Sequence, residues 1–199
     1  MVCVVDGDGL ARESLQRWIG CEGWRCEAFA SPQELFALPR AVVPNCLILD
    51  ASLEGLNALD LQSRLAIDRP ITPIIFITAR VDLFTAVKAM KAGAIEFLTK
   101  PLSPDALLTS IREALERSCV LLAHGAEMQV LRDRYSLLTA RERQVMALVV
   151  SGLLNKQVGG ELGISEITVK AHRGQVIQKM NANSFADLVK KAERLSLAA

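Results

Sequence analysis

The amino-acid sequence predicts an α/β doubly wound (βα)5 domain followed by an all-α domain. Short apolar runs alternate with amphipathic stretches over about the first 120 of the 199 residues, which is typical of a parallel sheet with helices on both faces. Only helical periodicity continues beyond that point. Residues 1–135 contain 14 Lys and Arg against 17 Asp and Glu, whereas residues 136–199 contain 9 against 5. The resulting net charges of −3 and +4 favour two domains, the second of which faces a polyanion.

Five strands are expected, each a short apolar run bounded by turn-forming or charged residues. They lie at residues 2–6, 24–29, 46–50, 73–78 and 95–98. Several are apolar throughout, as expected of parallel strands that are covered on both faces. The segments between them carry helix start signals. For example, Ser31 is followed by Pro32 and Glu34, which supply a cap, a first-turn proline and a capping-box carboxylate.

The C-terminal part is predicted to contain a helical linker at residues 118–135 and a domain at residues 136–199. Thr139 and Glu142 form a capping box at the start of the first helix of this domain. Three further helices are expected, at residues 155–162, 166–180 and 184–195. The break around Gly163 has the length and the glycine of a helix-turn-helix corner. The last helix repeats apolar residues at helical spacing and is expected to form a dimer surface from Leu188, Val189, Ala192 and Leu195.

The composition excludes several classes of protein. A chain with 51% hydrophobic residues can bury a core, which excludes intrinsic disorder. Apolar runs such as residues 46–49 and 74–77 are far shorter than the ~20 residues that cross a bilayer, so a membrane protein is not expected. The chain starts directly in a strand-like run, so export is not expected either. The five cysteines lack CxxC spacing and lie far from the two histidines, which favours reduced thiols in a cytoplasmic protein over a zinc site.

Four polar residues stand where apolar strands end. Asp6, Asp50 and Thr78 close three of the predicted strands, and Lys100 follows the last one. The carboxyl ends of parallel strands meet at one sheet edge, where such folds place their sites. Neighbouring carboxylates repel each other unless a cation joins them, which implies a hard metal ion such as Mg²⁺. A lysine and a hydroxyl beside such a centre suit the oxygens of a phosphoryl group.

The helix predicted at residues 166–180 has two different faces. Its core-facing positions are Val169, Val176 and Met180. The opposite side carries Lys170, Gly174 and Gln178, flanked by Ala171 and Arg173. We expect this opposite face to be cationic and polar without a large apolar group, which suits the major groove of DNA.

Two segments of the chain resemble known domains. Residues 1–117 resemble a response-regulator receiver domain, through VVD at 4–6, LILD at 47–50, ITA at 77–79 and KAGAIEFLTKP at 91–101. Residues 136–196 resemble the helix-turn-helix domain of NarL/FixJ (LuxR-type) regulators, through LTARER at 138–143, GLLNK at 152–156 and ISEITVKAH at 164–172. Together the two resemblances cover nearly the whole chain in the order expected of such regulators.

The receiver resemblance implies a role for each pocket residue. Asp50 accepts phosphate from the phosphohistidine of a sensor histidine kinase. Lys100 then pairs with the phosphoryl oxygens, and Thr78 moves to hydrogen-bond one of them. Phe97 is the aromatic switch that swings inward as Thr78 moves. The bond from Lys100 to Pro101 is expected to be cis, which aims the ammonium into the pocket.

The sequence departs from the receiver pattern at the metal site. The family shows two adjacent acids after the first strand, but Gly7 stands at the second position and Asp8 comes one residue later. Residues 53–55 and Ala58 also differ from the usual loop after the phosphoacceptor. The Mg²⁺ ligands that the resemblance implies are Asp6, Asp50, the backbone of Ser52 and, where its reach allows, Asp8. We therefore expect weak Mg²⁺ binding and slow phosphorylation.

The second resemblance implies contacts with double-stranded DNA. The positions that reach base edges are Lys170, Ala171 and Gly174, of which only Lys170 can donate a hydrogen bond. The candidates for phosphate contact are Asn155, Lys156, Thr168, His172, Arg173 and Lys179. His172 is equally compatible with a packing role. Sparse base contacts imply that phosphate contacts carry much of the affinity.

The chain is thus interpreted as a transcription regulator controlled by phosphorylation of Asp50, with no enzymatic activity of its own. Its implied partners are a sensor histidine kinase, DNA, RNA polymerase and a second copy of the chain on activation. One alternative is an atypical regulator that dimerises and binds DNA without phosphate. The other is a haloacid-dehalogenase-type phosphatase, because Asp6, Asp8 and Gly9 form a D-x-D-G loop. That class needs an acidic pair on a strand after Lys100, where the sequence offers only Asp105 and scattered helical acids.

Overall fold

The computed structural model describes residues 1–37, 45–53, 58–80 and 82–195. The chain divides into two compact units, Met1–Ala123 and His124–Ala199. Helix α5, Pro104–Ser136, is one α-helix of 33 residues that contributes to both units. The helical linker predicted at residues 118–135 is thus part of one continuous helix that begins earlier in the chain.

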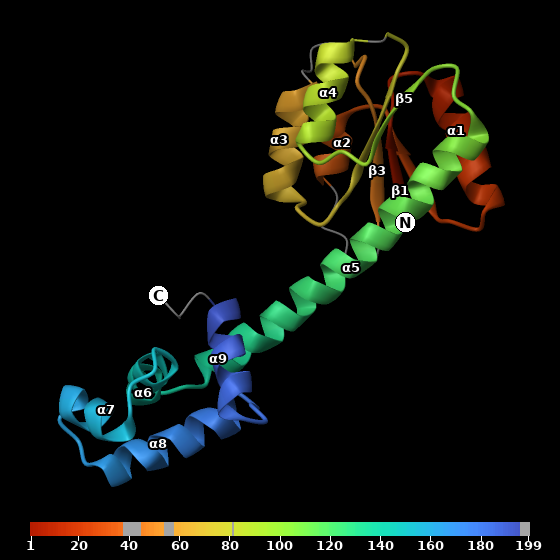
Figure 1. Cartoon of the computed structure of the whole chain (residues 1–199). Coiled ribbons are helices and arrows are strands. Elements are labelled where there is room, and N and C mark those ends of the chain that lie inside the picture. The colour runs from red at the N-terminus through yellow and green to blue at the C-terminus, as the bar shows by residue number, and fades with distance from the viewer. Residues whose placement is uncertain (38–44, 54–57, 81, 196–199) are drawn as a thin grey trace. The chain divides into compact units, whose positions relative to one another are not determined.

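The first unit contains a five-stranded parallel sheet of strand order β2-β1-β3-β4-β5. Helices lie on both sides of this sheet (Figure 1). Its strands are β1 Val2–Val5, β2 Cys26–Phe29, β3 Cys46–Asp50, β4 Ile74–Thr78 and β5 Glu96–Thr99. All five predicted strands are confirmed, and β1, β3 and β4 are buried along their whole length. This burial on both faces explains why these strands are apolar throughout.

Five helices surround the sheet, namely α1 Gly9–Cys21, α2 Pro32–Ala37, α3 Ala58–Asp68, α4 Leu83–Lys91 and the first part of α5. One core joins the sheet to α1 and α5 through Leu15, Ile19, Leu107 and Ile111. The core on the other face joins it to α2, α3 and α4 through Leu35, Leu61, Leu65 and Ala89. Helices on both faces confirm the doubly wound prediction.

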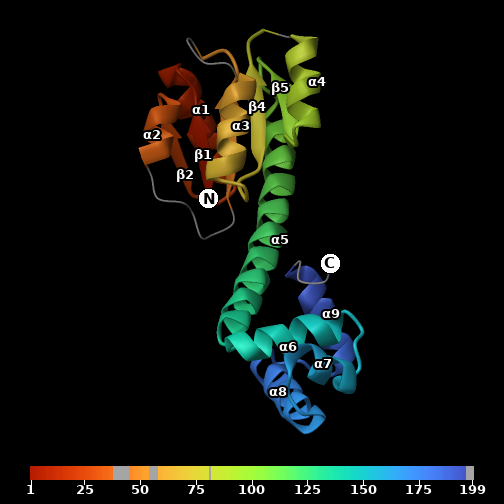
Figure 2. The ribbon, with the colours of Figure 1, turned by 90° about the vertical axis from the view of Figure 1, so that its left-hand side faces the viewer.

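The second unit is helical, with α6 Ala140–Val150, α7 Asn155–Leu162, α8 Glu166–Lys179 and α9 Phe185–Arg194 (Figure 2). The predicted capping box is present: the Glu142 N–H donates to Thr139 Oγ1 at 3.2 Å, and the Thr139 N–H donates to Glu142 Oε2 at 2.7 Å. Gly163 ends α7 in the left-handed region at φ 64°. The Ile164 N–H then donates to the Gly159 carbonyl at 3.0 Å, which closes the turn between α7 and α8.

The dimer surface predicted on the last helix is wrong for two of its four residues, Leu188 and Ala192. Leu188 and Ala192 are buried inside the second unit, where they pack with Met146 and Val176. Apolar residues at helical spacing form a core stripe as readily as an interface. In this helix they complete the core, so Leu188 and Ala192 offer no surface to a second chain.

Two adjacent glycines of α7 should respond oppositely to alanine. A Cβ atom on Gly159 would lie 2.8 Å from the Ile164 carbonyl oxygen, whereas a Cβ on Gly160 meets nothing within 4 Å. We expect Gly159→Ala to destabilise the second unit by about 1–3 kcal/mol through this overlap. Gly160→Ala should stabilise it by about 1 kcal/mol, because alanine loses less conformational entropy in a helix. Thermal unfolding of the two full-length variants, followed by circular dichroism, tests the pair. Equal shifts of both variants would contradict the close approach.

The cysteines occupy two kinds of environment. Cys3 and Cys46 are buried in the sheet, Cys26 is half-buried beside them, and Cys21 and Cys119 are exposed. Burial raises the pKa of Cys26 and of Cys46 to about 12, so the reactive thiolate form is suppressed at both.

Within the described residues, no three His, Cys, Asp or Glu side chains gather into a group that could hold a metal ion. No described helix is both long and apolar enough to cross a membrane.

Candidate functional site

Three charged side chains meet at the carboxyl edge of the sheet. Asp6 directly follows β1, Asp50 is the last residue of β3, and Lys100 directly follows β5. The Lys100 Nζ atom donates to Asp6 Oδ2 and to Asp50 Oδ2, at 2.7 Å in each case. The structure therefore brings together three of the four residues that the sequence placed at this edge, with one ammonium between two carboxylates.

The environment stabilises the positive charge of Lys100. Asp6 is fully buried and Asp50 is nearly so, which would leave their charges costly without a partner. Burial lowers the pKa of Lys100, but hydrogen bonds and charge interactions with Asp50 and Asp6 outweigh this effect and leave its pKa above the ordinary value. The cis peptide bond predicted between Lys100 and Pro101 is present.

Thr78, the fourth residue, lies at the end of β4 beside the loop that follows β3. Its Oγ1 atom is 3.0 Å from Ser52 Oγ and donates to the Arg80 carbonyl at 2.9 Å. The Ser52 N–H donates to Asp50 Oδ1 at 2.7 Å. The two oxygens of Asp50 therefore have different partners, Lys100 and the Ser52 backbone N–H. The Thr78 hydroxyl contacts the side chain of the same serine.

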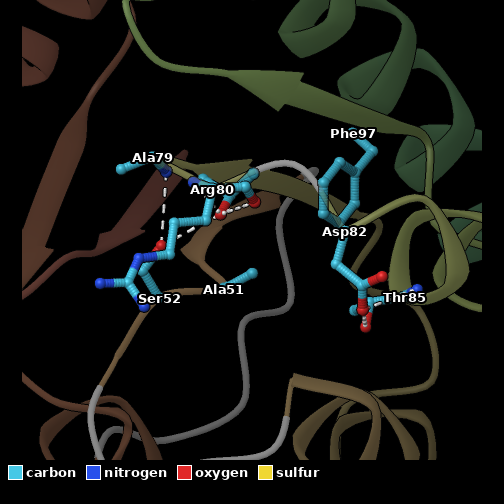
Figure 3. Close-up of a pocket in the computed structure, with 8 residues that line it drawn as sticks. Ala51, Ser52, Ala79, Arg80, Asp82, Thr85 and Phe97 are labelled. Carbon is cyan, nitrogen blue, oxygen red and sulfur yellow. Dashed lines mark hydrogen bonds between the residues drawn. The ribbon is translucent and has the colours of Figure 1, made fainter.

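A pocket of about 380 Å³ adjoins these residues (Figure 3). It is lined by Ala51, Ser52, Thr78, Ala79, Arg80, Asp82, Thr85 and Phe97. Asp82 caps α4 by accepting from the N–H groups of Phe84 and Thr85. The Phe97 ring is half-buried and lies 5.9 Å from the Phe76 ring. The residue predicted to be the aromatic switch thus borders the space between Thr78 and the start of α4.

The loop after β1 contains Asp8, which caps the helix that follows. The Asp8 carboxylate caps α1 by accepting the Leu10 N–H at 3.0 Å, and the Asp8 N–H donates to Asp6 Oδ1 at 2.9 Å. A Cβ atom on Gly7 would meet only Leu53 Cδ2, at 3.4 Å. Since Asp6 and Asp50 converge on one point, they fit a Mg²⁺ ion that keeps several water ligands. The cap engages one oxygen, Oδ1, of the Asp8 carboxylate.

The predicted DNA-contacting residues of the second unit fall into two groups. Lys170, Ala171 and Gly174 are exposed on α8, as are Thr168 on the same helix and Lys156 on α7. The others are held by neighbours or partly buried, namely Asn155, His172, Arg173 and Lys179.

Two of the cations in the second group already have protein partners. Arg173 Nη1 donates to Asn155 Oδ1 at 2.5 Å, and the guanidinium carbon lies 4.9 Å from the centre of the Phe185 ring. Lys179 Nζ donates to both carboxylate oxygens of Glu142, at 2.9 and 2.7 Å. Hydrogen bonding from Lys179, followed by that from the Thr139 backbone, lowers the pKa of Glu142. These cations help to hold α6, α7, α8 and α9 together.

One exposed apolar residue of α8, Ile167, was not predicted to lie on the DNA-facing side of the helix. Ile167 has 82% of its surface exposed and precedes Lys170 by one helical turn, on the same side of the helix. The expectation that this side lacks a large apolar group is therefore wrong. The three-residue spacing between Ile167 and Lys170 could have indicated this, because it places both residues on one side of a helix.

Comparisons with known proteins identify both domains of the chain. Residues 2–112 match the response regulator receiver domain, and residues 136–192 match the bacterial regulatory proteins of the luxR family. Nodulation protein W of Bradyrhizobium diazoefficiens is 41% identical over 199 residues, which cover 100% of this chain and 88% of that protein. The transcriptional regulatory protein FixJ of the same organism is 34% identical over 98% of this chain and 96% of its own length.

Solved structures with a similar fold are also response regulators. The solved structure of the response regulator StyR has a TM-score of 0.81 and 40% identity, over 97% of this chain and 98% of that chain. Full-length FixJ from B. japonicum has a TM-score of 0.56 and 32% identity, over 100% of this chain and 98% of that chain. The chain therefore belongs to the NarL/FixJ family of two-domain response regulators, in which a receiver domain controls a LuxR-type helix-turn-helix domain that binds DNA.

Proposed function

We propose that this transcription regulator is switched by phosphorylation of Asp50, with a sensor histidine kinase as the phosphate donor. The convergence of Asp6 Oδ2 and Asp50 Oδ2 on Lys100 Nζ, at 2.7 Å each, carries the proposal. A carboxylate oxygen of Asp50 attacks the phosphorus atom of the phosphohistidine. The P–N bond breaks as the P–O bond forms, and the released imidazole takes up a proton.

The residues around Asp50 suit the product of this transfer. A phosphoryl group brings negative charge that the Lys100 ammonium can neutralise, since it already lies 2.7 Å from Asp50. The Thr78 hydroxyl bonds to the Arg80 carbonyl and pairs with Ser52, so it can turn toward a phosphoryl oxygen by exchanging one partner. When Mg²⁺ is bound, Asp6, Asp50 and the Ser52 backbone would hold it, and it would supply further positive charge for the phosphoryl oxygens.

Labelling with acetyl phosphate tests the proposal. Wild-type protein should form an acid-stable, base-labile phosphoprotein with Mg²⁺ and little of it after chelation, and Asp50→Asn should form none. Wild-type protein that stays unlabelled at saturating Mg²⁺ would favour the regulator that works without phosphate. A generic phosphate ester separates the phosphatase class, because steady turnover of the ester would overturn the regulator assignment.

The metal site should improve when Gly7 becomes an acid. Gly7→Asp adds a carboxylate beside Asp6 in a space where a Cβ meets only the flexible end of Leu53. We expect Mg²⁺ affinity to rise about 10-fold and the labelling rate to rise with it, because the ion gains an anionic ligand. Isothermal calorimetry measures the affinity without any phosphate present.

Asp8→Asn is the matched control for this prediction. Asparagine keeps the oxygen that accepts the Leu10 N–H but loses the negative charge. Asp8→Asn should therefore leave the Mg²⁺ affinity of the protein nearly unchanged. A large loss in Asp8→Asn, or no gain in Gly7→Asp, would show that Asp8 already serves as the missing ligand.

The activated protein is proposed to dimerise through α4 and β5. Four large apolar residues of α4 are exposed, namely Leu83, Phe84, Val87 and Met90. Such a cluster favours a protein interface. It lies on the helix whose first turn borders the pocket shared by Thr78 and Phe97, so a change at Asp50 can reach it by shifting the balance between two receiver conformations. A dimer on DNA would then act on RNA polymerase in the cytoplasm.

A further inference from the structure

We infer that Ile167 reads the methyl group of a thymine in the major groove and so sets part of the operator preference of this regulator. The inference rests on DNA binding by α8. It adds a base-reading residue to the three positions that the family resemblance supplies.

Ile167 occupies the centre of the exposed face of α8. The residues three, four, seven and eleven positions further along are Lys170, Ala171, Gly174 and Gln178, all exposed. At roughly 100° of rotation per residue, these five positions fall within roughly 100° of one another around the helix axis. The buried residues Val169 and Val176 lie on the opposite side. Ile167 therefore shares its face with the base-contacting positions and not with the core.

The first turn of α8 is held firmly in place. The Thr168 N–H donates to Ser165 Oγ at 3.1 Å, and the Ser165 and Thr168 hydroxyls lie 2.8 Å apart. In the turn before this cap, the Ile164 N–H donates to the Gly159 carbonyl of α7 at 3.0 Å. A β-branched side chain in a helix has one strongly preferred χ1 rotamer. Ile167 is thus presented in a nearly fixed orientation and loses little side-chain entropy when it makes a contact.

The chemistry of the groove identifies what such a side chain can contact. Single exposed apolar residues are common on protein surfaces, so the 82% exposure of Ile167 does not by itself indicate a ligand. Its position does, because a helix-turn-helix domain reads bases with the N-terminal part of its second helix. The thymine methyl is the apolar group that base edges present in the major groove. An isoleucine at this place is therefore matched to thymine and mismatched to the polar edges of guanine and cytosine.

Thymine-to-uracil replacement tests the contact because it removes the methyl group alone. An operator is first selected from a random duplex library with full-length, beryllofluoride-activated protein, and each thymine in it is then replaced singly by deoxyuridine. We expect one position in each half-site where uracil weakens wild-type binding about 4-fold, as for the loss of one buried methyl group. Ile167→Ala should bind the thymine and uracil duplexes equally at that position. Its salt dependence should match that of wild type, because no phosphate contact is removed.

Two further variants make the outcome specific. Ile67→Ala removes an isoleucine of similar exposure, 83%, from α3 of the receiver and should keep the full uracil effect. Ala171→Gly removes the other methyl group near the bases, so a uracil effect that survives Ile167→Ala but vanishes in Ala171→Gly would assign the contact to Ala171 and overturn the inference. The inference is also overturned if no uracil position weakens an otherwise specific complex. Failure of wild-type protein to select any sequence would instead contradict DNA recognition by the chain.

Discussion

Asp50→Asn should abolish the shift from monomer to dimer that beryllofluoride induces in the wild-type protein. Beryllofluoride mimics a phosphoryl group on an aspartate, and its fluorines need the cation that Lys100 places 2.7 Å from Asp50 Oδ2. Asparagine lacks the negative oxygen that binds beryllium, so the variant keeps its resting state. Sedimentation velocity at several protein concentrations measures the shift. Equal dimerisation of untreated wild type and Asp50→Asn would favour the regulator that dimerises without phosphate.

A second arm of the same experiment tests where the dimer forms. Val87 lies among the exposed apolar residues of α4, and Ile67 is exposed on α3. Val87→Lys places a charge within the proposed interface and should prevent the induced dimer. Ile67→Lys carries the same charge on another helix and should dimerise like the wild type. Loss of the dimer in both variants would argue against an α4 interface.

Lys170→Ala should weaken binding to the selected operator by ~1–3 kcal/mol and blur its sequence preference, as expected for the loss of a base contact. Lys170 is exposed on α8, so its removal should leave the fold intact. Fluorescence anisotropy with operator and with scrambled DNA measures both effects. The affinity of the variant for scrambled DNA should fall little, since the non-specific complex depends on contacts with DNA phosphates.

Lys156→Ala is the matching variant for a phosphate contact. Lys156 is exposed in the first turn of α7, and its loss should weaken operator and scrambled DNA alike. The slope of log affinity against log salt should fall by about 0.9, the value for one phosphate contact on duplex DNA. If both lysine variants kept wild-type affinity across the salt titration, the assignment of α8 to the major groove would be wrong.

The sheet and its edge were predictable from the sequence because local pattern and topology agree there. Strands β1, β3 and β4 are buried on both faces, so they read as continuous apolar runs. In a parallel sheet, a polar residue at the end of such a run has only one edge to occupy. That rule is sufficient to bring Asp6, Asp50 and Lys100 together without any knowledge of side-chain geometry.

The helical unit was less predictable because its decisive contacts join distant residues. Lys179 was expected at a phosphate, but its partner Glu142 stands 37 positions earlier and was recognised only as a capping residue. Leu188 and Ala192 show the same apolar spacing whether they face a core or a second chain. Ile167 was overlooked because the apolar pattern of α8 was assigned wholly to its buried side. Spacing along one helix does not reveal what the opposite helix presents.

The bridge from Lys100 to Asp6 and Asp50 also has a consequence for the resting protein. Two buried carboxylates destabilise a fold when nothing offsets their repulsion, and in this pocket the chain supplies its own counterion at 2.7 Å. We therefore expect the receiver to fold without divalent ions. A metal ion that binds Asp6 and Asp50 would share their carboxylates with the Lys100 ammonium, whose positive charge weakens the attraction between the pocket and the metal. Changes in the cellular Mg²⁺ concentration would accordingly alter the rate of Asp50 phosphorylation and leave the amount of folded protein unchanged.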